Sequence, residues 1–154
     1  MILRNNLQIC EASKELVPDL VNLLRDLFLI EKDFKFNEEN HSKGLTLLIE
    51  DSNHIVITAN FDGELVAMIT IQTVISTVKG SKVGLIEDFI VKDDFRDMGI
   101  GTHLFSYIKE YSKANNFTRL QLVCDNDNEI AKEFYRNKKF KESNLTAWYY
   151  HIEE

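Results

Sequence analysis

EDFIVKDDFRDMGIGT, residues 87–102, is the most informative segment of this chain. It begins as an apolar strand, continues through a short polar loop and ends where a helix opens on Gly99 and Gly101. Glycine has no Cβ, so a ligand can approach the backbone closely at these positions. The first amides of a helix lack intrahelical acceptors, and the helix dipole favours an anion there. The stretch therefore predicts a seat for a pyrophosphate, to which Arg96 adds a fixed positive charge.

A second interpretation of the two glycines is that they only permit a tight turn between strand and helix. Two common nucleotide-binding motifs do not fit the sequence. A dinucleotide-binding fingerprint requires a third glycine where this chain has Leu104, and no Gly-Lys-Ser/Thr triplet of a phosphate-binding loop occurs.

The rest of the chain predicts a single domain over residues 1–154, with an α/β fold. Apolar periodicity and turn signals place strands and helices in the order β-α-α-β-β-β-α-β-α-β-β. The predicted strands are 7–10, 54–60, 65–74, 83–91, 120–124, 139–142 and 145–152, and the predicted helices are 13–28, 37–50, 99–115 and 128–137. This is a mixed sheet of about seven strands covered by helices, in which the helix at 99–115 forces strands four and five to run parallel.

Composition and charge narrow the classes of function. The 154 residues carry a net charge of −7, which disfavours nonspecific binding to nucleic acid. We see no secretory signal and no apolar run of the roughly 20 residues that cross a bilayer, so we expect a soluble, cytoplasmic protein without membrane contact. Cys10 and Cys124 have no metal or disulfide spacing, and we interpret both as small core residues.

Three motifs in order resemble the GNAT superfamily of acyl-CoA N-acetyltransferases. Arg96-Asp97-Met98-Gly99-Ile100-Gly101 matches the family signature Arg/Gln-x-x-Gly-x-Gly/Ala at every fixed position. The strand at 86–91 precedes it, and Asn128-x-x-Ala131-x-x-Phe134-Tyr135 followed by Phe140 comes after it. The order of elements also agrees over essentially the whole chain. One departure is Lys139, because the family often has glycine before the aromatic residue that matches Phe140, so we expect a looser turn there.

The resemblance implies where acetyl-CoA, the cosubstrate, would bind. Strands four and five splay apart, and the pantetheine arm lies between them along the main chain of Phe89, Ile90 and Val91. The pyrophosphate lies on the amides of the loop and helix start, in which Arg96, Asp97, Met98, Gly99, Ile100, Gly101 and Thr102 take part. Asn128, Ala131 and Phe134 line the CoA side. The basic segment 132–141 either offsets the cofactor phosphates or is a solvated helix face.

Amine acetylation needs a base for the ammonium proton and an acid for the departing thiolate. The resemblance implies Tyr135 as the acid, although Phe134 and Tyr135 could be a packing pair. We predict Glu87 as the base, acting directly or through water, since a carboxylate in an apolar strand is costly without a role or a partner. Strand alternation sends Glu87 and Asp88 to opposite faces, so only one of them can face the acceptor, and the resemblance implies that it is Glu87. Structural roles for both carboxylates, or a water chain as base, remain open, and Asp125 is a weaker candidate for binding the amine.

No metal is required for this chemistry, and His41, His54, His103 and His151 show no ligand spacing. An amide near Phe89 is the expected donor to the oxyanion. The resemblance implies that the first two helices and the late strands shape the acceptor site. The 12 acidic and 6 basic residues of 1–64 then favour a small cationic acceptor such as a polyamine, an aminoglycoside or an amino sugar. A peptide or protein amine remains open, as does an acyl-CoA-binding sensor or subunit without activity. The family often forms homodimers through late strands, and the run Trp148-Tyr149-Tyr150 suits either a dimer contact or a core strand.

Overall fold

The computed structural model describes residues 6–152 and divides the chain into two compact units, the first ending at Gln121 and the second beginning at Leu122. The assignment of one domain to residues 1–154 stays a prediction. The first unit contains a five-stranded mixed sheet in the order β1-β2-β3-β4-β5. Its strands are β1 (Leu7–Glu11), β2 (His54–Phe61), β3 (Glu64–Ser76), β4 (Ser81–Val91) and β5 (Leu120–Gln121). Neighbours are antiparallel except β4 and β5, which are parallel as predicted.

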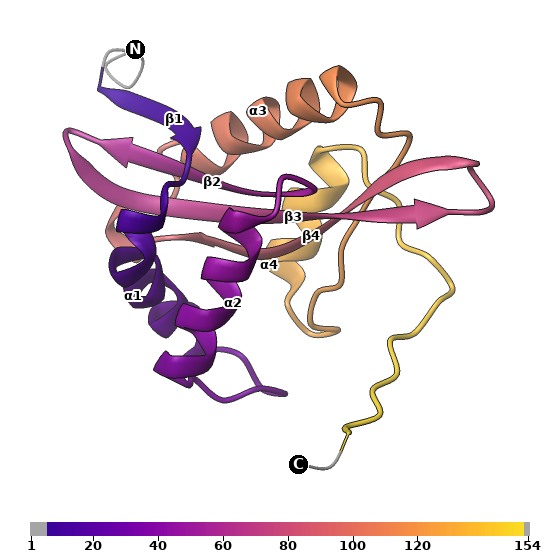
Figure 1. Ribbon diagram of the computed structural model, residues 1–154, viewed down its shortest axis with the longest axis horizontal. Helices are drawn as coiled ribbons and strands as arrows, with labels where there is room; N and C mark the ends of the chain where they lie inside the picture. The colour runs from indigo at the N-terminus through magenta and orange to yellow at the C-terminus, as the bar shows by residue number, and fades with distance from the viewer. Residues whose placement is uncertain (1–5, 153–154) are drawn as a thin grey trace. The chain divides into compact units, whose positions relative to one another are not determined.

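Helices cover both faces of this sheet (Figure 1). The helices α1 (Val17–Phe28) and α2 (Glu38–Glu50) lie on one face, and α3 (Ile100–Ala114) lies on the other. Short 3₁₀ turns, η1 (Lys14–Leu16) and η2 (Asp93–Phe95), precede α1 and α3. The α/β fold, its mixed sheet and the helices on both faces are confirmed.

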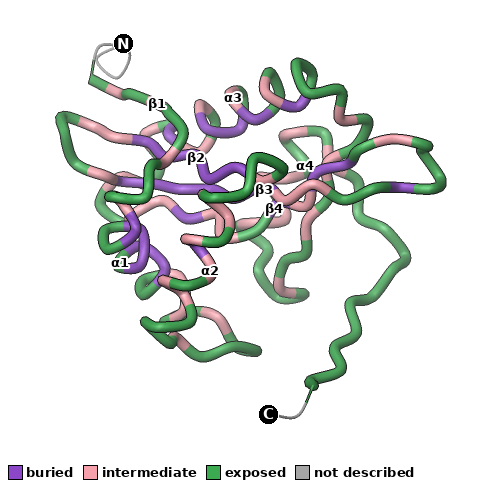
Figure 2. Tube along the Cα trace, in the orientation of Figure 1, coloured by how far each residue is buried: buried purple, intermediate pink, exposed green. Residues whose placement is uncertain are grey.

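Two layers of apolar side chains hold the first unit together, because the period-two alternation of the strands sends buried residues to both faces. One layer joins α1 and α2 to the sheet through Leu20, Leu24, Leu45, Met68 and Ile90. On the opposite face, α3 packs against β1–β4 and buries Ile100, Leu104, Phe105 and Ile108. Figure 2 shows this buried interior along the strands and the inner side of α3.

Gly84 explains the close approach of β5 to β4. A Cβ at this position would lie 2.7 Å from a Leu120 methyl and 2.9 Å from an Ile71 methyl, which is too close for carbon atoms. In the parallel pairing of β4 with β5, Gly84 lies opposite Leu120 and Leu85 lies opposite Gln121. β5 ends there, while β4 runs on to Val91. The splay of strands four and five that the resemblance implies stays a prediction.

The number and lengths of the late strands were predicted wrongly. Within residues 6–152 the structure has five strands where about seven were expected, and β5 stops at Gln121 although alternation continues to Cys124. Residues 139–142 and 145–152 form no strand. The apolar side chains of residues 145–152 are exposed, with Trp148 at 90% and Tyr150 at 88% (Figure 2). Alternation is typical of a strand only where a neighbouring strand completes the hydrogen-bonded ladder, and here the structure shows none.

The second unit contains one helix, α4 (Glu129–Asn137), among its described residues. The prediction of this helix is confirmed to within one residue at its start. Both cysteines are exposed rather than in the core, which corrects their interpretation. Cys10 lies on the edge strand β1, and Cys124 lies beyond the end of β5, so neither position is covered on both sides.

Candidate active site

The loop from β4 to α3 contains two residues in the left-handed region of backbone conformation. Asp97 has φ +60° and Gly99, the N-cap residue of α3, has φ +83°. Gly99 is exposed, and a Cβ placed on it would meet only the His103 ring, at 3.9 and 4.0 Å. The first intrahelical bond runs from the His103 amide to the Gly99 carbonyl, at 3.1 Å. Amides before such a bond have no acceptor within a helix, so they can receive an anion from the exposed side of Gly99.

Arg96 stabilises the conformation of this loop through two interactions. Its Nε donates to the Val91 carbonyl at 3.2 Å, and its guanidinium forms an ion pair with Asp93 at 2.8 Å. The side chain is half exposed, so its charge remains near the start of α3 while its bonds fix the path of the chain. The sequence predicted the charge but not these two contacts.

The predicted cofactor positions on β4 differ in their surroundings. Ile90 is buried in the core beneath α1 and pairs with Met68, so its side chain serves packing. Val91 pairs with Ala67. Any contact of Ile90 with a ligand is therefore through its backbone.

A β-bulge in β4 changes the orientation of one predicted carboxylate. Ile90 pairs with Met68 but Glu87 pairs with Thr70, so β4 carries one more residue than β3 over this interval. Asp88 lies in the bulge with φ +49°, a left-handed conformation that aspartate tolerates better than most residues. Its carboxylate accepts a 3.4 Å hydrogen bond from Thr70, while Glu87 accepts one of 2.9 Å from Gln72.

The prediction that Glu87 and Asp88 point to opposite faces is therefore wrong. Thr70 and Gln72 are two residues apart on β3 and share a face, and each holds one of the two carboxylates. Both carboxylates line the same cavity, of about 570 Å³. The alternation rule fails because the bulge inserts a residue between the paired positions.

This cavity, which we call the acceptor cavity, lies wholly within the first unit between α2 and the strands β3 and β4. Four acidic residues line it, and none of the described residues lining it is lysine or arginine. The lining consists of Leu24, Asn40, His41, Gly44, Leu45, Leu47, Leu48, Glu50, Asp51, His54, Gln72, Glu87 and Asp88. Such a surface has a negative potential that attracts cations.

Burial raises the pKa of Glu87, and the neighbouring Asp88 raises it further, whereas the hydrogen bond from Gln72 lowers it. The pKa of Asp88 is also raised by burial, and is lowered by the Thr70 hydrogen bond and by His41. A carboxylate whose pKa moves up towards neutrality is a better proton acceptor in catalysis. The pair thus combines negative charge with a capacity to take up a proton.

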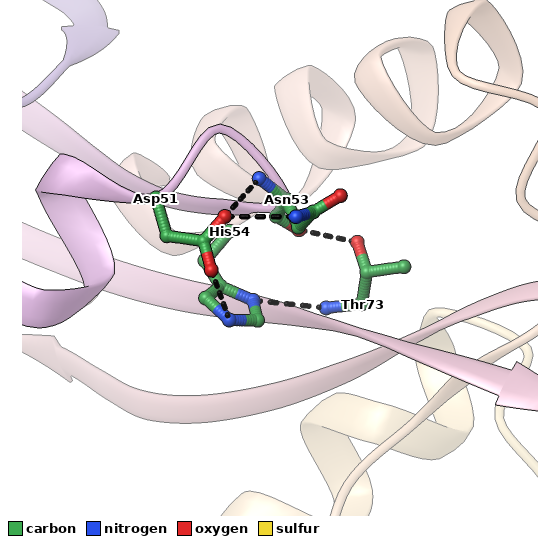
Figure 3. A network of polar contacts seen from close by, with 4 residues as sticks. All are labelled: Asp51, Asn53, His54 and Thr73. Carbon is green, nitrogen blue, oxygen red and sulfur yellow. Dashed lines mark hydrogen bonds and ion pairs between the residues drawn. The ribbon is translucent and has the colours of Figure 1, made fainter.

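A fixed polar network lies at one side of the acceptor cavity (Figure 3). The Thr73 amide donates to His54 Nδ1 at 3.3 Å, which assigns the ring proton to Nε2, 3.5 Å from Asp51 Oδ2. The other Asp51 oxygen accepts from the amide and the side chain of Asn53, at 2.8 and 2.9 Å. These bonds lower the pKa of Asp51. Both nitrogens of His54 are engaged, so this histidine connects α2, β2 and β3.

In the second unit, Asn128 is the N-cap of α4, and its side chain accepts from the Ala131 amide at 3.1 Å. The helix ends in a Schellman motif: the Phe140 amide donates to the Tyr135 carbonyl and the Lys139 amide to the Arg136 carbonyl, both at 3.0 Å. Lys139 takes the left-handed position with φ +73°. The expected looser turn is therefore wrong, because lysine adopts the conformation usually left to glycine.

This turn places Tyr135 between two aromatic rings. Its ring centroid is 5.7 Å from Phe134 and 5.7 Å from Phe140. Burial, with a smaller contribution from Cys124, raises the pKa of Tyr135 to about 12. The phenol is therefore protonated at neutral pH and can donate a hydrogen bond, as the role of acid requires. The Tyr135 ring also packs between Phe134 and Phe140, as the alternative packing role requires.

The basic segment 132–141 is partly neutralised within the second unit. Lys132 and Arg136 lie 3.5–3.9 Å from the carboxylates of Glu129 and Glu142. Lys138 lies over the Phe134 ring, 5.1 Å from its centroid. These contacts favour a helix face stabilised by ion pairs.

The sequence-predicted residues divide between the units. Glu87, Phe89 and the loop at 96–102 lie in the first unit, and Asn128, Ala131, Phe134 and Tyr135 lie in the second. Sequence reasoning missed His41 as part of the acceptor cavity, and it allowed only one of Glu87 and Asp88 to face the acceptor. The signal for Asp88 was its polar character in an apolar strand, whereas His41 gave none because its role depends on the packing of α2.

Comparison with known proteins identifies the class. The chain matches solved acetyltransferase structures over nearly its full length. A possible acetyltransferase from Clostridium difficile 630 has a TM-score of 0.85 at 20% identity, covering 97% of this chain and 100% of that one. An aminoglycoside acetyltransferase from an uncultured soil metagenomic sample, in complex with sisomicin, has a TM-score of 0.81 at 21% identity, covering 98% and 99%. At these identities the likeness establishes the fold.

The sequence comparisons establish the family. Residues 17–140 match the model of the acetyltransferase (GNAT) family, and the chain belongs to that family. An uncharacterized N-acetyltransferase of Archaeoglobus fulgidus is 26% identical over 138 residues, which cover 88% of this chain and 93% of that protein. The chain is thus an N-acetyltransferase that uses acetyl-CoA as cosubstrate. None of its described helices has both the length and the apolar character needed to span a bilayer.

Proposed function

We propose that this N-acetyltransferase acts on the primary amine of a small cationic acceptor, such as a polyamine, an aminoglycoside or an amino sugar. The observation that carries the proposal is the acceptor cavity, in which Glu50, Asp51, Glu87 and Asp88 supply negative charge. An ammonium group gains from such a lining, and an anionic acceptor would be repelled. The family likeness to aminoglycoside acetyltransferases supports an acceptor with several amino groups.

In the proposed reaction, Glu87 takes a proton from the acceptor ammonium, directly or through water. The free amine attacks the thioester carbonyl, so that a C–N bond forms and the C–S bond breaks. The amine loses its second proton to solvent water as the amide forms. Tyr135 donates a proton to the departing thiolate and is reprotonated from solvent, and Glu87 releases its proton to solvent before the next turnover. The raised pKa of Glu87 and the protonated phenol of Tyr135 support these roles.

The cosubstrate would bind through the backbone of the loop and of β4. Gly99 leaves open space where a Cβ would stand, and this fits a pyrophosphate close to the helix amides. Phe89 lies between the registered pairs Glu87–Thr70 and Ile90–Met68, and its amide is the proposed donor to the oxyanion.

The test is release of free thiol from acetyl-CoA over a panel of amines, including putrescine, spermidine, sisomicin, glucosamine 6-phosphate and a peptide with a free N-terminus. We expect polycationic amines to react best. Glu87→Gln should lower kcat on the order of 10²-fold or more, while Glu110→Gln, an exposed carboxylate on α3, should leave it unchanged. Preference for the anionic or the peptide acceptor would contradict the proposal, as would full activity of Glu87→Gln.

A further inference from the structure

Two carboxylates of the acceptor cavity lie on the same face of the sheet but at different strands. On β4, Glu87 accepts a 2.9 Å hydrogen bond from Gln72, and next to β2, Asp51 lies 3.5 Å from His54 (Figure 3). His54 and Gln72 are directly opposite each other in the antiparallel pairing of β2 with β3, so their side chains share a face. Two strand spacings separate β2 from β4, which places Asp51 and Glu87 roughly 10 Å apart.

The two carboxylates differ in their chemistry. The Thr73 amide donates to His54 Nδ1, so this nitrogen carries no proton and the imidazole is neutral. The contact with His54 therefore leaves the negative charge of Asp51 in place. Hydrogen bonds from Asn53 lower the pKa of Asp51, whereas burial raises the pKa of Glu87. Asp51 is thus suited to hold a cation, and Glu87 is suited to take a proton from one.

Glu50 also lines the cavity at the end of α2, but Lys14 forms an ion pair with it. The charge of Glu50 is balanced in this way within the protein, which leaves Asp51 as the anion available to a ligand on this side of the cavity.

The α2 wall of the cavity is apolar before it reaches Asp51. Gly44, Leu45, Leu47 and Leu48 line the cavity from this helix. A Cβ on Gly44 would meet nothing within 4 Å, so the space beside it is open. Leucine offers no hydrogen-bonding group, and a hydroxyl that leaves water without a partner costs free energy. This wall therefore suits methylene groups better than the hydroxyls of a sugar.

We propose that the acceptor is an unbranched aliphatic polyamine, with its reacting nitrogen at Glu87, a second ammonium at Asp51 and its methylenes against the leucines of α2. This inference rests on the proposed function and narrows its acceptor, and it makes Asp51 a specificity-determining residue. With each ammonium about 2.8 Å from its carboxylate, the two nitrogens would lie about 4–10 Å apart, a distance that a spacer of about three to five carbons spans. Acetylation neutralises the nitrogen at Glu87, and the nitrogen at Asp51 keeps its charge.

The first test compares acceptors of matched length. Putrescine has an ammonium at each end of a four-carbon chain, and butylamine has a methyl group in place of one of them. We expect kcat/KM of the wild-type enzyme to be about tenfold higher for putrescine, because only putrescine gains the contact with Asp51. Sisomicin, which carries its amino groups on sugar rings, should react more slowly than putrescine or spermidine.

The decisive variant is Asp51→Asn, which removes the charge but keeps an oxygen that can accept both hydrogen bonds from Asn53. We expect its melting temperature to match that of wild type. Its kcat/KM ratio of putrescine to butylamine should fall about tenfold, mainly through KM, because Asp51 holds the second ammonium equally in the ground and transition states. Asp33→Asn, at an exposed position in the loop between α1 and α2, should keep the wild-type ratio.

Equal kcat/KM for putrescine and butylamine in wild type, an unchanged ratio in Asp51→Asn, or a preference for sisomicin over the linear amines would overturn the inference. Each of these results would leave the proposed acetylation of a cationic amine in place. Calorimetric binding of spermidine that is weakened in Asp51→Asn, in a protein that acetylates no amine, would instead refute the proposed function and support the polyamine site.

Discussion

Gly99 and Gly63 offer a matched test of the phosphate seat, because both have φ +83° and neither has an obstructing neighbour. Gly99 is the N-cap residue of α3, whereas Gly63 lies in the turn of the β2–β3 hairpin. Alanine at either position must adopt a left-handed conformation, which costs roughly 1–2 kcal/mol. The reduced freedom of the unfolded chain offsets about 0.4–1 kcal/mol of this cost. Both variants should therefore lose about 1 kcal/mol of stability.

Only Gly99→Ala should lose affinity for acetyl-CoA. The added methyl group would stand on the exposed side of the loop, 3.9 Å from the His103 ring, and would keep a pyrophosphate away from the helix amides. We expect Kd to rise about tenfold, equivalent to about 1.4 kcal/mol. Calorimetric titration with acetyl-CoA measures the affinity, and urea unfolding of the same samples measures stability.

The comparison of the two variants separates binding from folding. Equal acetyl-CoA affinity of Gly99→Ala and Gly63→Ala, at equal stability, would show that the start of α3 does not hold the pyrophosphate. The two glycines at 99 and 101 would then only shape the turn between β4 and α3.

Three further predictions concern the second unit and the sheet. Tyr135→Phe should lower kcat on the order of 10²-fold with acetyl-CoA affinity nearly unchanged, and full activity in steady-state assays would remove Tyr135 from the mechanism. Lys139→Gly should raise stability by about 0.5–1 kcal/mol in urea unfolding, because glycine adopts the φ of +73° without strain. The control Lys139→Ala should show no gain. Equal stability of the two variants would contradict the idea that lysine is strained at this position. Gly84→Ala should lower stability by about 1–3 kcal/mol, since its Cβ would overlap Leu120 and Ile71. An unchanged melting temperature would contradict this prediction, because it would show that β5 can move away from β4 at little cost.

The elements of the first unit could be predicted because each carries a local signal. Short segments of sequence contain the signals for the hairpin turn at Asp62 and Gly63 and for the helix α3. Both predictions agree with the structure within a few residues. The loop at 96–99 could be predicted for the same reason. A glycine just before a helix is a local signal of a turn, because glycine adopts the left-handed conformation at little cost.

What could not be predicted depends on partners distant in sequence. Trp148 and Tyr150 are residue types common in strands, but a strand forms only where a neighbouring strand pairs with it through backbone hydrogen bonds. Lys139 shows the opposite case, because the Schellman hydrogen bonds and the contact between Tyr135 and Phe140 impose a conformation that lysine alone disfavours. In both places tertiary context decides against local preference.

The bulge at Asp88 links backbone geometry to the charge of the acceptor cavity. In a regular β4, Asp88 would face away from Glu87, and the cavity would lose one of its two inner carboxylates. The bulge requires a residue that tolerates φ +49°, and aspartate meets this need while also supplying the charge. The two properties are separable, because asparagine keeps the tolerance without the charge, whereas glutamate keeps the charge without the tolerance. Asp88 is thus the position at which one side chain both tolerates a left-handed backbone and supplies negative charge for the proposed cationic acceptor.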